Sequence, residues 1–273
     1  LDAYNAKIVR PVHLEQRVKH SRWCVLRYPN AAMAQLALTS TEAFEDYYFR
    51  VCNIAYEKMA EAVIPLAQRL GRADRVRILA PGTDLRFSSR GIPNVPCVGD
   101  RNIPDGELFT APVRDSVEGE VQFNTPTLLE GRPFDHIRLR FEKGRVVDCA
   151  DGGGNTEELL RILDRDEGAS FIGEWSIAFH PLIQRPMRDI LFDEKINGSW
   201  HLALGNCYDE APNGNQSALH WDLVQIQRPE FGGGTIELDG EVIRRDGRFV
   251  PADLQGLNPE QLGGEAHGTT PAP

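Results

Sequence analysis

The sequence predicts a protein of the α+β class (mixed α/β), with a domain of largely antiparallel strands behind a long N-terminal helix. From Arg75 onward, short runs with alternating apolar residues are separated by Gly, Asp or Pro, as in the strands of hairpins. Before that point, apolar residues recur at three- and four-residue steps, as on one face of a helix. With 273 residues, of which 41% are hydrophobic, the chain can form one large domain or two smaller ones.

The first third of the chain predicts a short strand and then the long helix. Residues 22–28, RWCVLRY, are strand-like, and Thr39 and Glu42 have the spacing of a capping box at a helix start. We expect Pro65 to kink the helix and Gly71 to end it. Its periodic apolar residues predict one buried stripe, made of Phe44, Tyr48, Val51, Ala55, Met59 and Ala62.

The rest of the chain predicts hairpins and one further helix. Tight turns are expected at Lys143-Gly144, Asp239-Gly240 and Asp246-Gly247. A helix is predicted at TEELLRILDRDEGA, with Thr156 as its cap and Gly168 at its end. The last residues, from 261 to 273, have the composition of a disordered tail.

Charge and cysteine usage restrict the partners and the compartment. The 40 acidic residues against 30 basic ones give a formal charge of -10, which offers no support for a nucleic-acid or anionic-membrane partner. The 5 cysteines are odd in number and form no CxxC pair, which favours a reducing cytoplasm over a disulfide framework. No apolar run approaches the roughly 18 to 20 residues of a membrane helix. We therefore expect a cytoplasmic protein.

The stretch HLALGNCYDEAPNGNQSALHWD, residues 201–222, carries the first chemical signal. Strand periodicity places His220 and Asp222 on one face, while Trp221 points into packing. A histidine nitrogen and a carboxylate oxygen at this spacing can bind one divalent ion, and His201 can add a third ligand from a neighbouring strand. The same residues can also form a simple His–Asp hydrogen bond, so the triplet alone leaves both interpretations open.

Two glutamates in apolar surroundings strengthen the metal hypothesis. Glu107 follows a turn in NIPDGELFTAP, and Glu174 interrupts the apolar run FIGEWSIAFH. Burying a carboxylate is costly unless it is paired or bound to a cation, so we predict one site shared with the histidines. An ion pair to arginine is the alternative explanation for either glutamate. His180 precedes Pro181 and is expected at a turn rather than in the site.

Four motifs, PDGELFTAP, GEW, WHLALGNCY and NQSALHWDLV, occur in an order that resembles the thermophilic-type metallo-aminopeptidases, the aminopeptidase T family or peptidase family M29. RYPN, TEAFEDYYFRV, PGTDLRFS, LFDEKINGS and GLNPE extend the similarity over most of the chain. The resemblance implies a binuclear divalent-metal site with ligands at Glu107, Glu174, His201, Tyr208, His220 and Asp222.

The resemblance also implies the reaction, the hydrolysis of the N-terminal residue of peptide substrates that have a free amine. The two divalent ions can be Zn, Co, Mn or Mg, since all accept mixed nitrogen and oxygen ligands. Among the catalytic candidates, Tyr208 can be a phenolic ligand or can stabilise the oxyanion, and Glu174 or Glu107 can be the general base.

Family members are homodimers with an additional N-terminal α/β region, of which this chain carries little. Leu1 in place of Met leads us to expect that the sequence begins inside a longer chain. The corresponding domain prediction has three parts. Residues 1–95 are a remnant of the N-terminal α/β region and the linking helix, residues 96–260 are the metal-binding catalytic domain, and the tail follows.

Two other functions are compatible with parts of the pattern. A related ring-cleaving dioxygenase of the dihydroxypyridine type could hold one Fe(II) with His201, His220 and Asp222, but it has no need of the two glutamates. A fragment that binds metal without turning over substrate is the second alternative. The tryptophans beside the predicted ligands could line a specificity pocket, although packing behind the strands is the more economical explanation; they are Trp175, Trp200 and Trp221.

Overall fold

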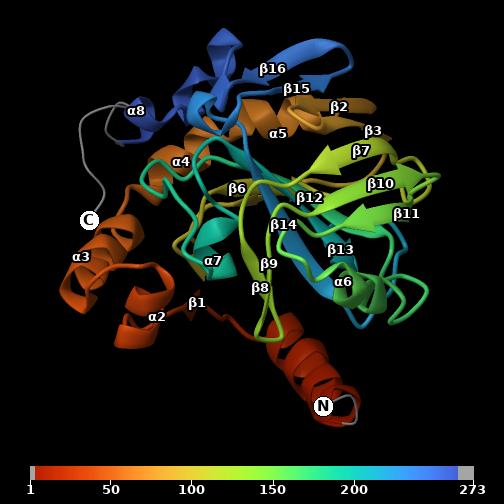
Figure 1. The fold of residues 1–273 in the computed structure, drawn as a ribbon. Helices are drawn as coiled ribbons and strands as arrows, with labels where there is room; N and C mark the ends of the chain where they lie inside the picture. Colours follow the sequence, from red (N-terminus) through yellow and green to blue (C-terminus); the bar gives the residue numbers. More distant parts are fainter. Residues whose placement is uncertain (1–3, 264–273) are drawn as a thin grey trace.

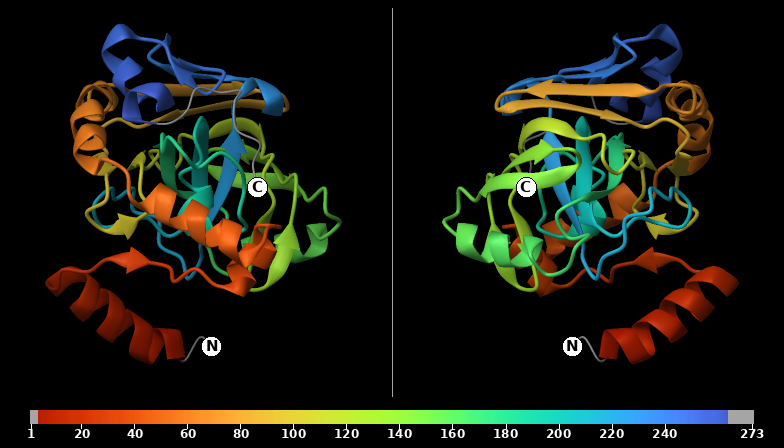
Figure 2. Two further views of the ribbon diagram at one scale, coloured as in Figure 1. Left: turned by 90° about the vertical axis from the view of Figure 1, so that its left-hand side faces the viewer. Right: turned by 90° about the vertical axis from the view of Figure 1, so that its right-hand side faces the viewer.

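The computed structural model describes residues 4–263 and confirms the α+β class. Two antiparallel sheets lie against each other with their strands crossing, and the helices lie at their edges (Figures 1 and 2). The larger sheet has the strand order β11 (Arg145–Ala150), β10 (Arg138–Glu142), β7 (Glu118–Gln122), β3 (Thr83–Ser88), β2 (Arg75–Ala80), β15 (Thr235–Leu238), β16 (Glu241–Arg245) and β17 (Arg248–Phe249). The smaller sheet has the order β14 (His220–Ile226), β13 (Ser199–Gly205), β12 (Ile172–Ala178), β6 (Glu107–Thr110) and β4 (Val95–Cys97).

The three predicted turns join strands as expected. In each, both central residues have positive φ, for example 49° at Lys143 and 79° at Gly144. Such a pair forms the mirror-image turn whose twist matches that of the flanking strands. Strands β2 and β3 lie inside the larger sheet, between β15 and β7. The division into two regions at residue 95 stays a prediction.

The N-terminal region differs from the prediction in several details. The expected single helix is divided into α3 (Thr41–Cys52), α4 (Tyr56–Ala62) and α5 (Ile64–Leu70), because Asn53 leaves the helical conformation with ψ of 52°. Ser40, not Thr39, caps α3 by accepting a hydrogen bond from the Ala43 N–H. The strand predicted for residues 22–28 is only β1 (Val25–Leu26), which pairs with β5 (Asn102–Ile103).

Other helices also begin or end elsewhere than expected. Helix α6 (Thr156–Leu163) stops before Gly168, and Thr156 does not cap it but accepts a hydrogen bond from the Asp151 N–H. Helix α8 includes the first two residues of the predicted tail, and residues 264–273 lie outside the described residues. Helix η1 was not among the predicted elements, and it contains Pro11. The remaining elements are η1 (Asn5–Val18), α2 (Ala31–Leu36), β8 (Thr127–Leu129), β9 (Arg132–Phe134), α7 (Ile190–Asp193), η2 (Pro229–Phe231), η3 (Ala252–Leu257) and α8 (Pro259–Leu262).

The main core lies between the two sheets, where three tryptophans of the smaller sheet meet phenylalanines. The ring centroid of Trp175 is 5.1 Å from that of Phe87 on β3. The ring centroids of Trp221 and Phe134 are 5.0 Å apart. Trp200, which is fully buried, contacts Phe123 at 6.0 Å. The tryptophans therefore pack behind the strands and do not line a specificity pocket.

A second apolar cluster holds α7 against α3, on the other side of the smaller sheet. Phe44, Tyr47 and Tyr48 of α3 surround Phe192, with ring centroids 6.2 to 6.3 Å from it. The predicted stripe is thus buried at Phe44, Tyr48, Val51 and Met59, but Ala55 is exposed where the helix breaks. Because α7 is fixed in this way, the residues that follow it reach the polar face of the sheet. In the described residues, no helix is both long and apolar enough to cross a membrane.

Candidate metal centre

Four neighbouring strands of the smaller sheet bring acidic and histidine side chains to one face. Glu174, Ser176 and Ala178 alternate along β12 and therefore share a face. The strand register places His201 of β13 directly opposite Ser176, and Glu107 of β6 opposite Ala178. On β14, Asp222 pairs with Ala203 and His220 with Gly205. The tryptophans occupy the alternate positions and so face the core, as strand periodicity predicts.

His201 is held between a backbone carbonyl and the acidic residues. Its Nδ1 lies 3.3 Å from the Glu194 carbonyl oxygen. Its Nε2 lies 3.2 Å from Glu174 Oε1 and 3.8 Å from Asp222 Oδ1. When Nδ1 donates to a carbonyl, Nε2 is left as the lone-pair nitrogen, which is the orientation of a typical metal-binding histidine.

His220 has the same arrangement on the other side of Glu174. Its Nδ1 lies 2.8 Å from the Asn206 carbonyl oxygen, and its Nε2 lies 3.4 Å from Glu174 Oε2 and 3.5 Å from Asp222 Oδ1. A glycine makes this possible, because a Cβ at Gly173 would lie only 2.3 Å from the Asn206 carbonyl oxygen. The carbonyl that orients His220 could not approach β12 if any other residue stood at 173.

The potential ligand atoms form two adjoining groups that share Glu174. One group is Glu107, Glu174 and His201, and the other is Glu174, His220 and Asp222; within each group the ligand atoms lie within 4.8 Å of one another. Glu174 directs one oxygen to each histidine. Five of the six residues predicted for the site are therefore brought together by the fold.

The sixth predicted residue, Tyr208, lies at the rim of the site. It follows the end of β13, is 44% exposed, and stacks on His220 with ring centroids 4.7 Å apart. His180 is outside the cluster, as expected. Its Nε2 lies 2.9 Å from the Val51 carbonyl oxygen and its Nδ1 accepts the Leu182 and Ile183 N–H groups, so both ring nitrogens are already used.

Several residues of the centre were missed by the sequence analysis. Lys195 is fully buried, with its Nζ 3.4 Å from Glu107 Oε1, 4.0 Å from Asp105 Oδ1 and in contact with the Glu194 carboxylate. Ser176 donates a 2.8 Å hydrogen bond to Glu107 Oε2. The signal was present in LFDEKINGS, where a charged triplet ending in Lys195 stands inside a largely apolar segment.

A third acidic group, Cys97, Asp105 and Glu107, lies next to the centre. Asp105 already accepts the N–H groups of Gly99 at 2.9 Å and Gly106 at 3.1 Å, and Lys195 lies beside it. We therefore attribute this group to the packing around Lys195.

The charges of the cluster act strongly on its histidines. Burial by itself lowers the pKa of His201, but the hydrogen bond that its ring donates to Glu174 and the charge of Glu107 outweigh it and raise this pKa to about 10. Burial also opposes ionisation of Asp222, yet the neighbouring His220 lowers its pKa to about 2. Negative charge thus exceeds positive charge in the cluster. Protons on the histidine nitrogens occupy the positions at which metal cations would otherwise be favoured.

A buried cluster of two histidines and several carboxylates, with both histidines oriented by backbone carbonyls, defines a metal-centre protein built on a two-sheet α+β fold. Residues 2–249 match the model of the thermophilic metalloprotease family (M29), and the chain belongs to this family.

Individual relatives agree with the family assignment. Aminopeptidase T of Thermus thermophilus is 34% identical over an alignment of 171 residues, which covers 57% of this chain and 39% of that protein. The structure of wild-type AmpT from Thermus thermophilus superimposes with a TM-score of 0.68 at 29% identity, over 77% of this chain and 59% of that one. The chain therefore spans well under two thirds of the length of these relatives.

A 2,5-dihydroxypyridine dioxygenase from Pseudomonas putida has a similar fold. Its TM-score is 0.63 at 18% identity, and the alignment covers 84% of this chain and 71% of that one. At this identity the likeness concerns the fold alone.

Proposed function

We propose that the chain is a metal-dependent aminopeptidase that removes the N-terminal residue from peptides with a free amine. The observation that carries the proposal is the convergence of both histidine Nε2 atoms on the carboxylates of Glu174 and Asp222, with both Nδ1 atoms bound to backbone carbonyls. The family of the chain and the relatives named aminopeptidase support this reaction.

The donor set fits two divalent ions better than one. The cluster and its immediate surroundings contain five carboxyl groups and one ammonium group, that of Lys195. With every carboxyl ionised, as bound cations favour, four net negative charges remain; the carboxyl groups are those of Asp105, Glu107, Glu174, Glu194 and Asp222. Two divalent ions neutralise this charge, whereas a single Fe(II), as in the dioxygenase alternative, leaves half of it uncompensated in a buried site.

We propose Glu107, Glu174, His201, His220 and Asp222 as the residues that would hold the ions, and Tyr208 as a further ligand at the rim. When bound, such ions polarise a peptide carbonyl and lower the pKa of water. Zn, Co, Mn and Mg all suit these donors.

Three side chains of the site have different proposed roles in catalysis. Glu107 is anchored at one oxygen by Ser176 and at the other by Lys195, so it is held as a fixed ligand. Glu174 faces both histidines and is our candidate for handling the proton of the attacking water, through an oxygen that is not acting as a ligand at that moment. Tyr208 stacks on His220 and can donate its phenol O–H to a developing oxyanion.

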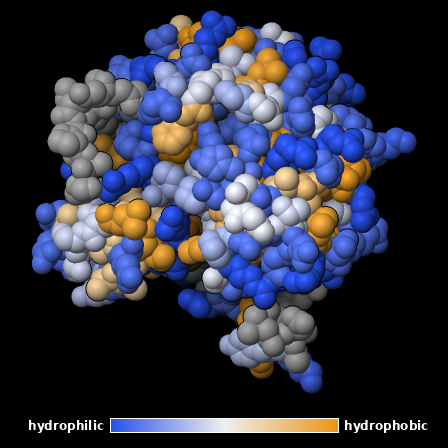
Figure 3. All heavy atoms as spheres, viewed as in Figure 1, coloured by the Kyte–Doolittle hydropathy of each residue, from blue (hydrophilic) through white to orange (hydrophobic). Residues whose placement is uncertain are grey.

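We further propose a homodimer in the cytoplasm. Exposed apolar side chains gather over α2 and α3 (Figure 3), among them Leu36, Leu38 and Phe49, and they offer a surface that a second subunit could cover. All 5 cysteines are free thiols, which suits a reducing compartment.

Two measurements test the proposal. Elemental analysis of protein that has never met a chelator should give about two divalent ions per chain, and a single iron would support the dioxygenase instead. Leu-p-nitroanilide should be hydrolysed while N-acetyl-Leu-p-nitroanilide is not, because the acetyl group removes the free amine. Equal cleavage of the two compounds would contradict an aminopeptidase.

A further inference from the structure

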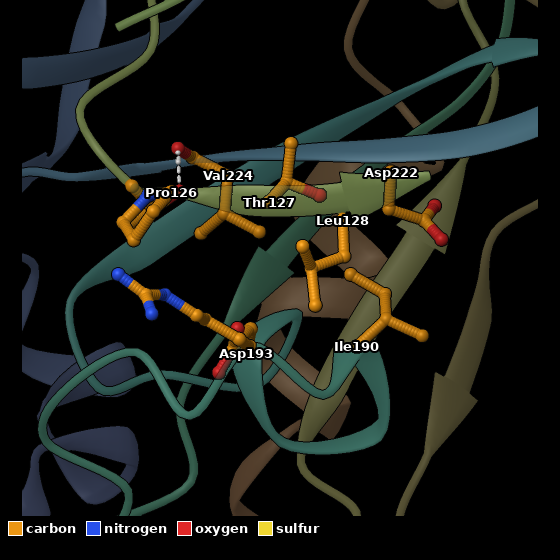
Figure 4. A pocket seen from close by; sticks show the side chains of 9 residues that line it. Pro126, Thr127, Leu128, Ile190, Asp193, Asp222 and Val224 are labelled. Atoms are coloured by element: carbon orange, nitrogen blue, oxygen red, sulfur yellow. Dashed lines mark hydrogen bonds between the residues drawn. The ribbon is translucent and has the colours of Figure 1, made fainter. Parts of the chain in front are cut away.

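A cavity lies directly beside Asp222 on the ligand face of the smaller sheet (Figure 4). Its walls come from β14, from β8 and the chain that enters it, and from α7 with the turn before it. The cavity volume is about 30 Å³, which is enough for a small polar group such as a carboxylate, and the cavity opens to solvent. Val224 forms one wall. It follows Asp222 by two residues on the same strand, so the two Cα atoms are about 7 Å apart along the strand. The cavity is therefore within one side-chain length of a proposed metal ligand.

Most polar groups of this cavity already have partners inside the protein. Thr125 Oγ1 donates to the Val224 carbonyl at 2.6 Å, and Thr127 Oγ1 accepts the Trp221 indole N–H at 3.3 Å. Asp193 Oδ1 accepts the Met187 N–H at 2.5 Å. Arg188 is an exposed residue at the edge of the cavity, and its guanidinium is the charged group of the lining for which the described residues provide no hydrogen bond or ion pair.

The backbone that carries Arg188 is held in an unusual conformation. Its φ is 56°, in the left-handed region that side chains other than those of Gly and Asn rarely adopt. The buried carboxylate of Asp193 binds the N–H of Met187 and interacts with the backbone N–H of Arg188. Asp193 thus fixes the turn that places Arg188 at the cavity, in the way that strained backbone is often maintained at binding sites.

We propose that Arg188 binds a carboxylate of the substrate and that this cavity is a substrate subsite next to the metal centre. A guanidinium presents paired N–H donors that match a carboxylate, and the apolar walls of Leu128 and Ile190 can hold the methylene groups that connect it to the peptide. The carboxylate has two possible sources, the side chain of an N-terminal Asp or Glu or the C-terminus of a dipeptide. The inference rests on the proposed aminopeptidase function.

The test compares Arg188→Met and Arg188→Lys with wild type on four substrates. Leu-p-nitroanilide and Leu-Gly-amide carry no carboxylate, Glu-p-nitroanilide carries one on its side chain, and Leu-Gly carries one at its C-terminus. Arg188→Met should lower kcat/KM roughly 10- to 100-fold on a carboxylate substrate, mainly through KM, and leave the carboxylate-free substrates near wild type. Arg188→Lys should recover part of the loss. Arg72→Met, at an exposed arginine lining a different pocket, is the matched control and should behave as wild type.

The outcomes separate the two sources and the two proposals. A loss confined to Glu-p-nitroanilide assigns the side-chain carboxylate, and a loss confined to Leu-Gly assigns the terminal one. Equal effects on all four substrates, or no effect on any, overturn the subsite while cleavage of Leu-p-nitroanilide still upholds the aminopeptidase. If wild type cleaves none of the four, the aminopeptidase proposal fails and the subsite fails with it. Thermal melts confirm that each variant is folded.

Discussion

The two faces of the smaller sheet have opposite roles, although they are built from the same strands. One face buries three tryptophans in the main core, and the other gathers the histidines and carboxylates of the metal centre. Sequence neighbours fall on opposite faces in three cases: Glu174 and Trp175, His201 and Trp200, Asp222 and Trp221.

The difference shows how a rigid site is obtained from strand periodicity. Each tryptophan fixes the backbone from behind next to a proposed ligand, and Glu107 is held within β6. No loop therefore has to position any of the five ligand side chains on the strands. Tyr208, which lies after the end of β13, is the predicted site residue without such support, and it is also the most exposed of them. Substitutions on the two faces should therefore separate loss of function from loss of stability.

The largest effect on function is expected at the ligand face. Asp222→Ala and Glu107→Ala should each lower kcat/KM on Leu-p-nitroanilide by more than about 100-fold, and reduce the bound metal, because each removes a proposed ligand. Kinetics and elemental analysis measure both quantities, and circular dichroism should show an intact fold. Asp209→Ala is the control, since this exposed carboxylate pairs with Lys19 outside the cluster and should keep nearly full activity. Near-normal rates in either ligand variant would remove that residue from the site.

On the opposite face, Trp200→Ala should lower the free energy of unfolding by about 3 to 5 kcal/mol. The side chain is fully buried against Phe123 and donates a 3.0 Å hydrogen bond to Gln225, so its removal leaves a cavity and an unpaired amide. Urea unfolding measures the loss, and Trp200→Phe provides a milder variant if the first does not fold. The folded fraction should still bind metal; a loss of metal with unchanged stability would contradict the division between the faces.

The alternation that separates the faces was readable from the sequence. A period of two predicts that His220 and Asp222 share a face opposite Trp221, and the β13–β14 register agrees. The hairpin turns were equally readable, because Asp-Gly and Lys-Gly pairs favour positive φ at both residues. These features depend on contacts between residues close in the chain, which is why a local pattern predicts them.

Features that depend on distant contacts were not predicted. The long helix was expected to be continuous because its apolar spacing is continuous, but α3 packs on α7 while α4 and α5 join the main core, and the chain must bend between them. Lys195 was missed for the same reason. A lysine next to two acidic residues reads as a surface segment until α7 is known to lie over Glu107.

Two serines on the ligand face allow residues that orient a ligand to be distinguished from residues that only pack there, and Ser176 is the first of them. Ser176→Ala removes the hydroxyl that holds Glu107 Oε2 and should weaken metal affinity about 10- to 100-fold, the usual effect of losing a group that orients a ligand. Ser199→Ala is the matched control. Ser199 lies on the same face of β13 as His201. Its buried hydroxyl donates to the Ile196 carbonyl and touches no proposed ligand. Competition with a chelating dye measures both affinities, and equal affinities in the two variants would show that Ser176 has no orienting role.

Asp193 tests whether a buried carboxylate near the centre must be a ligand. Burial raises its pKa from the ordinary 3.8 to about 8, so its contribution to stability is present below about pH 4 and is lost as the pH rises through 8. Asp193→Asn keeps an oxygen to accept the Met187 N–H but does not titrate. The unfolding free energy of wild type should therefore decline relative to that of the variant between pH 5 and pH 8, by at most about 1.4 kcal/mol per pH unit. Urea titrations of both proteins across this range, treated with chelator, give the difference directly, because the other titrating groups are common to the two. Parallel pH profiles would mean that the carboxyl of Asp193 is ionised in the folded protein even without a metal ion, which would contradict a protonated, structural role for it.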